Sequence, residues 1–183
     1  MKGRNRRVAL VTVALAALTL GLTAVATAGG SSTSDVVHAT AKYRDVAVAK
    51  RAGFGLLKDK KGIACIAMDD MPGMGAMGVH YVKSARVGDG RIAATAPEAL
   101  VYAPAANGKL RLAAVEYVVL KTAWDAHHGS APSLFGHRFN FTPAGNRFGL
   151  PAYYSLHAWL FKPNPSGEFS MWNPNVSCTK KGG

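Results

Sequence analysis

A β-hairpin signal in the middle of the chain constrains its fold more than any other feature. Two strand-like segments, 98–103 and 109–121, flank the dipeptide Asn107-Gly108, which favours the tight turn of a hairpin. Side chains alternate between the two faces of a strand, and one face of segment 109–121 is apolar except for Glu116 near its centre. We therefore predict an antiparallel strand pair whose apolar face, with Glu116 in it, points into the core.

Weaker patterns on either side of this hairpin complete the prediction of a fold class. A helix is predicted from Thr40 to about Ala52, because Thr40 can cap it and Gly53 can end it. Further extended segments are predicted at 63–67, 78–83, 133–139 and 152–162. One N-terminal helix followed by a mostly antiparallel sheet of five or six strands is an α+β domain, and a small β-barrel is the alternative.

The first residues of the chain predict export. A basic start and an uncharged apolar run precede Ala26-Thr27-Ala28, a pattern typical of a signal peptide cleaved before Gly29. An uncleaved signal anchor is the alternative, and no later apolar stretch is long enough to span a membrane. The expected organisation is a signal peptide at 1–28, a flexible tether at 29–39 and a single globular domain at 40–183, secreted to the extracellular space or cell envelope.

The expected mature chain is basic. Four of the 22 Lys and Arg residues and none of the ten Asp and Glu residues precede Gly29, which leaves a net charge of +8. Such a charge could bind an anionic cell-envelope polymer, or it could serve solubility alone. The sequence contains no nucleic-acid-binding motif, and export also argues against a nucleic-acid partner.

The two cysteines, Cys65 and Cys178, are expected to form a disulfide. Exported proteins meet an oxidising environment, and an even number of cysteines favours pairing there. In the chain-entropy model, closing a loop of about 110 residues stabilises the fold by nearly 5 kcal/mol. A thiol metal site is the alternative, but the cysteines lack the close spacing typical of one.

A methionine-rich loop is one of two candidate ligand sites. In the stretch "AMDDMPGMGAMGVH" (67–80), methionines recur every three residues and a histidine ends the series. Cu(I) prefers thioether and imidazole ligands, so Met71, Met74, Met77 and His80 are candidate copper ligands. The alternative is a glycine-rich bend whose methionines fill gaps in a core.

The second candidate site lies on the predicted strands. In segment 152–162, one face carries His157 among aromatic residues that include Tyr153, as expected of a pocket wall. We expect Glu116, His157 and Tyr153 to line a pocket with His80, and two histidines with one carboxylate suit a divalent transition metal. A buried, hydrogen-bonded Glu–His pair is the alternative. With a two-residue turn in the hairpin, position 99 opposes 116, so Glu98 and Glu116 should point to opposite faces.

Several segments resemble a group of uncharacterised exported proteins of high-GC bacteria. The resemblance rests on "PGMGAMGVHYV", "LRLAAVEYVV" and "YYSLHAWLFKPNPSGEFSMWNPNVSC", and it extends from about Thr40 to Cys178. It implies export and a single domain, but it implies no activity, ligand or catalytic residue.

Three hypotheses for the function follow from these features. The leading one is an exported ligand-binding domain, with copper held by the methionine-rich loop as the candidate ligand. The second is a cupin-like metalloenzyme that uses His80, His157 and Glu116. The third is a basic cell-envelope interaction module without chemistry. The sequence leaves open whether the protein is an enzyme.

Overall fold

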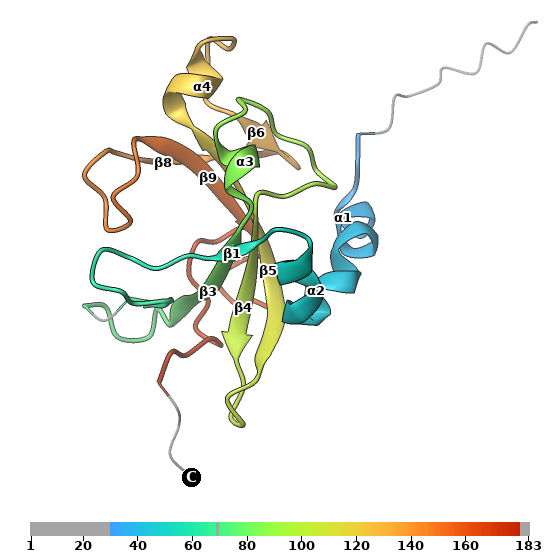
Figure 1. The fold of residues 1–183 in the computed structure, drawn as a ribbon, viewed down its shortest axis with the longest axis vertical. Helices are drawn as coiled ribbons and strands as arrows, with labels where there is room; N and C mark the ends of the chain where they lie inside the picture. The colour runs from blue at the N-terminus through green and yellow to red at the C-terminus, as the bar shows by residue number, and fades with distance from the viewer. Residues whose placement is uncertain (1–29, 69, 180–183) are drawn as a thin grey trace, which may run out of the picture. The chain divides into compact units, whose positions relative to one another are not determined.

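An antiparallel β-sheet with the N-terminal helices on one face forms the domain (Figure 1). The computed structural model describes residues 30–68 and 70–179, so the predicted signal peptide lies outside the described residues. The helical elements are α1 (Thr33–Thr40), η1 (Ala41–Arg44), α2 (Val46–Arg51), α3 (Ser84–Val87) and α4 (Lys121–Asp125). The strands are β1 (Gly55–Leu56), β2 (Cys65–Ala67), β3 (Ala76–Val82), β4 (Ala99–Pro104), β5 (Leu110–Leu120), β6 (Ser133–Leu134), β7 (His137–Arg138), β8 (Asn140–Thr142) and β9 (Tyr153–Ala158).

The sheet confirms the predicted α+β class. Its strands follow the order β1-β3-β4-β5-β9-β8, β2 also pairs with β3, and β6 and β7 form a separate two-stranded ribbon. Every strand pair is antiparallel. Within the described ranges no pairing joins β8 to β1, so the sheet is open and the barrel alternative is wrong.

Helical structure begins earlier than the sequence patterns predicted. The Ser32 side chain accepts a hydrogen bond from the Asp35 amide, and the Asp35 carboxylate accepts one from the Ser32 amide. This capping box starts α1 at Thr33, inside the segment predicted as a tether. Of the predicted helix from Thr40 to Ala52, the first part is the 3₁₀ helix η1 and the rest is α2, capped by Asp45. No helix in the described part of the chain is long and apolar enough to cross a membrane.

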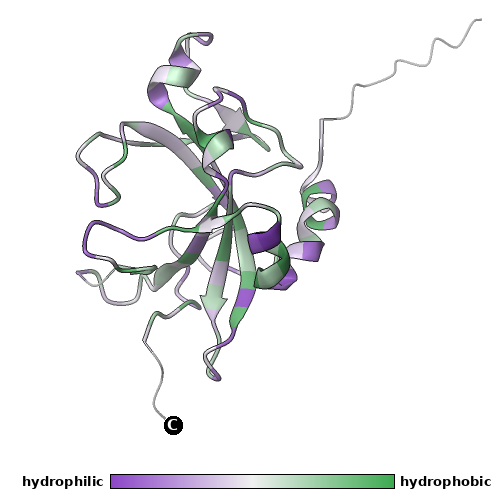
Figure 2. Ribbon diagram, in the orientation of Figure 1, coloured by the Kyte–Doolittle hydropathy of each residue, from purple (hydrophilic) through white to green (hydrophobic). Residues whose placement is uncertain are grey.

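The two faces of the sheet differ in what covers them. On the helix face, the sheet side chains pack against α1, α2 and the residues that follow α2, and this cluster is the main core. Its buried members include Val36, Ala49, Phe54, Leu100, Tyr102, Val115, Tyr117, Val119 and Leu156. On the opposite face, which we call the cavity face, a smaller apolar cluster contains Val101, Ala114, Trp159 and Val176. Figure 2 shows the central strands as mostly hydrophobic, whereas α1 and α2 alternate between hydrophobic and hydrophilic residues.

The central hairpin has the predicted register, but its loop differs from the predicted two-residue turn. Its loop has three residues, because Ala105 pairs with Lys109, and Gly108 takes the positive φ of 75° that this loop requires. A shift between Val101 and Tyr102 then restores the pairing of Ala99 with Glu116. Glu98 and Glu116 therefore lie on opposite faces, as predicted. Glu116, however, lies on the cavity face rather than in the main core, which is on the other side of β5.

A disulfide and a backbone bridge hold the C-terminal segment against β2 and the start of β3. Cys65 and Cys178 form the predicted disulfide, with 5.6 Å between their Cα atoms. Asn173 pairs with Ala76 through two backbone hydrogen bonds of 3.2 Å. A Cβ atom on Gly75 would lie 2.1 Å from the Asn173 carbonyl oxygen, so only glycine allows this approach. One glycine of the methionine-rich loop is thus explained by packing rather than by a ligand.

Candidate metal centre

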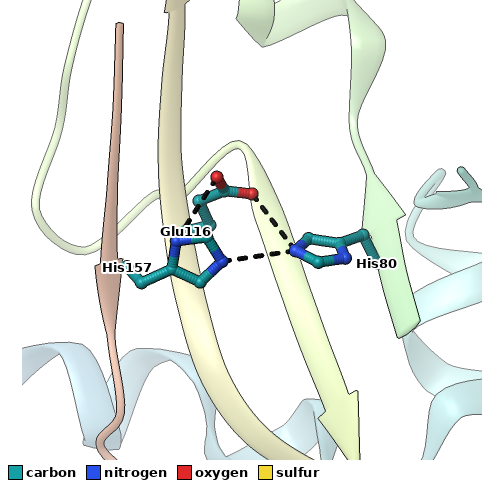
Figure 3. Close-up of side chains that lie close together, drawn as sticks. All are labelled: His80, Glu116 and His157. Carbon is teal, nitrogen blue, oxygen red and sulfur yellow. Dashed lines mark hydrogen bonds and ion pairs between the residues drawn. The ribbon is translucent and has the colours of Figure 1, made fainter. Parts of the chain in front are cut away.

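Three neighbouring strands bring two histidines and a glutamate together. His80 projects from β3, Glu116 from β5 and His157 from β9, as Figure 3 shows. Glu116 and His157 are direct cross-strand partners, so their side chains share one face of the sheet. His80 pairs with Val101 of β4 and lies on the same face. All three side chains are buried.

A small residue on β4 allows His80 and Glu116 to meet. The strands β3 and β5 are separated by β4, a distance of about 10 Å between strand axes. Ala99 is the β4 partner of Glu116 and shares its face, and its side chain is a single methyl group. Because this methyl group fills little space, the longer side chains of Glu116 and His80 can reach each other above it.

Two distances from His80 Nε2 match the spacing of ligands around one metal ion. His80 Nε2 lies 3.3 Å from His157 Nε2 and 3.5 Å from Glu116 Oε2. The second Glu116 oxygen, Oε1, lies 3.5 Å from His157 Nδ1. One potential ligand atom from each residue falls within 4.8 Å of the others. Two atoms bound at about 2.1 Å to a tetrahedral ion are about 3.4 Å apart, so the cluster could hold a metal.

Burial keeps both imidazoles in the form that binds metals. Loss of solvent lowers the pKa of His80 to about 4, although the nearby Glu116 carboxyl opposes this shift. Burial alone lowers the pKa of His157 to about 3. Both rings are therefore neutral at pH 7, and their contacts with Glu116 are not ion pairs between opposite charges. Neutral imidazole is the form that coordinates a metal ion.

Glu116 has no cationic partner in the cluster. Burial raises the pKa of its carboxyl, and the interaction with His80 and a hydrogen bond from Ser155 only partly offset this effect. A buried carboxylate needs a neighbouring positive charge or must take up a proton. Since the histidines are neutral, a divalent cation would supply the missing charge.

Two buried nitrogen atoms of the cluster have no hydrogen-bond partner. They are Nδ1 of His80 and Nδ1 of His157, and no other buried side-chain nitrogen or oxygen in the described residues is left unpaired. The Gly78 carbonyl lies near enough to His80 to raise its pKa slightly, but no hydrogen bond of normal geometry forms. Unpaired buried polar atoms are costly and are unusual in a purely structural network.

The cluster forms part of the wall of a cavity of about 510 Å³. His80, Glu116 and Tyr153 line it, whereas His157 is fully buried and is not part of the lining. The cavity is also bordered by β1, by the segment that follows it and by the loop between β8 and β9, drawn in teal and orange in Figure 1. An ion held by the cluster would therefore be accessible from the cavity through the side that His80 and Glu116 occupy.

The predicted methionine ligands are distributed differently. Met71 is 48% exposed, and Met74 is partly buried in the same loop. Met77 lies on β3 and lines the cavity together with His80. His80 follows Ala76, where the loop enters β3, by four residues or about 13 Å along the strand. Of the four proposed copper ligands, only Met77 and His80 share the cavity.

Sequence reasoning missed the residues that shape the space around the cluster. Ala99 gives no signal in the sequence, because one alanine in an apolar strand is ordinary. Arg147 and Phe148 line the cavity from a loop without strand or helix pattern. Ser155 could have been found, because it shares a strand face with His157 and Tyr153.

Comparisons with protein-family models, with curated proteins and with solved structures gave no match.

Proposed function

We propose that this is an exported metalloenzyme in which His80, His157 and Glu116 hold one divalent transition-metal ion at the wall of a substrate cavity. Export is supported by the signal-peptide pattern of the N-terminal sequence and by the disulfide between Cys65 and Cys178. The observation that carries the proposal is the convergence of three buried ligand groups at metal-ligand spacing.

The composition of the cluster favours particular ions. Two imidazoles and one carboxylate suit Zn²⁺, Fe²⁺ and Mn²⁺, and the described cluster contains no thiolate that would favour softer ions. Three protein ligands leave coordination positions free, as is typical of catalytic sites, whereas structural sites are usually closed. An ion bound here would polarise a substrate group or activate water.

The chain's own residues have distinct tasks in this proposal. The neutral imidazoles of His80 and His157 supply nitrogen lone pairs, and the Glu116 carboxylate supplies negative charge. Ala99 keeps the space between His80 and Glu116 clear. The mostly apolar cavity wall strengthens electrostatic interactions at the ion, because it lowers the local dielectric constant.

The other two hypotheses have less support. A copper site formed by the methionine-rich loop would have to gather the exposed Met71 with His80, which already contacts Glu116 and His157. The envelope interaction module is supported by net charge alone. It does not explain why three buried polar side chains converge beside a cavity.

Metal analysis of the purified protein tests the proposal. The exported protein is purified without chelator, its bound metals are determined by mass spectrometry, and Zn²⁺ and Mn²⁺ are titrated against a competing chelator. We expect one ion per chain. His157→Ala and Glu116→Gln should each weaken binding more than about 100-fold, because loss of a ligand costs more than loss of its outer-shell support.

Two control variants make the test specific. His38→Ala removes an exposed histidine on α1 and should leave metal affinity unchanged. Met71→Leu/Met74→Leu removes two thioethers of the loop and should also leave it unchanged. Equal affinity in wild type and His157→Ala would contradict the proposal. Tight Cu(I) binding that is lost only in the methionine variant would favour the copper hypothesis.

A further inference from the structure

The cavity beside the metal cluster has a polar end and an apolar body. Glu116, Val118 and Leu120 alternate along β5 and all face the cavity, so its wall extends about 13 Å from the carboxylate to Leu120. Apolar side chains from other segments complete the body, among them Leu56, Val87, Phe148 and Leu150. The cluster that contains His80 and Glu116 occupies one end of this wall.

The charge at the polar end selects the kind of group that can bind there. A divalent ion held by two neutral imidazoles and one carboxylate would leave a net charge of +1 at a buried position. A singly charged oxygen donor neutralises that charge, whereas an ammonium group adds to it. The polar end therefore fits a carboxylate better than it fits a neutral or cationic group.

Among the described residues that line the cavity, the one cationic side chain is already paired. Among the described lining residues, Arg147 alone carries a positive charge, and its Nη2 lies 2.9 Å from Asp59 Oδ2. Asp59 also accepts hydrogen bonds from the amides of Lys61 and Ile63, which fix its carboxylate. Because Asp59 satisfies Arg147, the metal end remains the better position for an anionic group.

From this arrangement we infer that the natural ligand is a small apolar carboxylate, with its head group on the ion and its hydrocarbon body along Val118 and Leu120. The inference rests on the proposed metal site and adds the chemical class of its substrate. Apolar contact with the cavity wall would supply most of the affinity, and the ion would fix the orientation.

Calorimetry with simple probes tests the inference without any mutation. Octanoate, acetate and octylamine are titrated into the zinc-loaded protein and into the metal-free protein. We expect octanoate to bind the zinc form at least about tenfold more tightly than the metal-free form, and octylamine to bind neither form well. Along the series from acetate to octanoate, affinity should rise roughly three- to fourfold for each added CH₂ group that is buried.

A cavity-filling variant locates the hydrocarbon body. Leu120→Trp places a larger side chain at the far end of the wall, about 13 Å from Glu116, so it should weaken octanoate binding about tenfold or more and leave zinc affinity unchanged. Ile63→Trp is the matched control, because Ile63 is 45% exposed and lies outside the cavity lining. It should change neither binding constant.

The outcomes separate the two proposals. If zinc binds but octanoate does not, or octylamine binds equally well, the inferred ligand class is wrong and the metal site stands. If zinc does not bind, the proposed function fails. Octanoate binding of equal strength with and without zinc would overturn the metal-anchored head group.

Discussion

On the helix face of the sheet, the buried tyrosine hydroxyls have hydrogen-bond partners, whereas on the cavity face two buried histidine nitrogens do not. Tyr102 and Tyr117 each donate a hydrogen bond to a backbone carbonyl, at 2.6 and 2.7 Å. Across the sheet, His80 and His157 each leave a buried Nδ1 atom unpaired. A face that only stabilises the fold should satisfy its polar atoms, so the unpaired nitrogens distinguish the cavity face from the helix face.

The two buried glutamates repeat this contrast. Glu98 Oε2 accepts a hydrogen bond of 3.0 Å from the Val118 amide, so the backbone provides its partner. Glu116 pairs with Ala99, the residue after Glu98, so it lies on the other face, where it meets two neutral imidazoles instead. We propose that the helix face holds the fold together and that the cavity face carries the metal site.

Truncating the helix face should cost stability and leave metal binding intact. Leu100 is fully buried in the main core, and Leu100→Ala should lower the free energy of unfolding by about 2–5 kcal/mol because it leaves a cavity. Urea unfolding measures the loss, and zinc titration of the folded variant should give the wild-type affinity. Loss of zinc affinity in a variant that is still folded would contradict the division between the faces.

Removing the polar groups of the cavity face should have the opposite effect on stability. In the metal-free protein, His80→Leu/Glu116→Leu/His157→Leu should raise the free energy of unfolding by about 1–4 kcal/mol, because the buried polar groups no longer lack partners. The variant should bind no metal. Tyr117→Phe is the matched helix-face change and should destabilise the protein by about 1 kcal/mol. Destabilisation by the triple substitution would indicate a structural role for the cluster.

The size of the residue at position 99 should decide whether the cluster can bind an ion. Ala99→Leu places extra carbon atoms between His80 and Glu116, so metal binding should be lost and the free energy of unfolding should fall by about 1–3 kcal/mol. Ala99→Gly keeps the space open and should retain metal affinity at a cost of about 0.5–1 kcal/mol. Zinc titration of both variants measures the difference. Equal affinity in both would contradict the proposed role of Ala99.

Glu98 should make stability depend on pH without affecting the cluster. Burial raises the pKa of Glu98 from 4.5 to about 8, so the folded protein keeps a proton that the unfolded chain releases above pH 4.5. Its contribution to stability therefore declines as pH rises towards 8, by about 1–3 kcal/mol between pH 6 and pH 8. Glu98→Gln cannot titrate and should lose this part of the decline in urea unfolding. An identical decline in both proteins would contradict the assignment.

The order and class of the main elements could be predicted from local patterns. Strand alternation identified β5 and β9, and Asn107-Gly108 identified the hairpin between β4 and β5. The predicted pairing of position 99 with Glu116 is confirmed, although a three-residue loop and a later register shift replace the two-residue turn. The extra loop residue and the register shift cancel each other, and no local sequence pattern predicts either of them.

The candidate residues could be named from the sequence, but their grouping could not be derived from it. Glu116 and His157 stood out because a polar side chain on an apolar strand face needs a partner. His80 was assigned both to the methionine-rich loop and to the strand cluster, since a sequence does not show which neighbours a side chain meets. The early start of α1 was missed because the capping box at Ser32 and Asp35 lies in a stretch that resembled a linker.

What the sequence determined by itself is local: periodicity sets the strands, an Asn-Gly pair sets the hairpin, and residue type sets which side chains are costly to bury. The tertiary structure decided which of those side chains meet. His80, Glu116 and His157 are separated by 36 and 41 residues, and they converge because β3, β5 and β9 lie within one sheet and Ala99 leaves room between them. Strand order and register depend on the packing of the whole domain, so no segment of the chain contains that information alone.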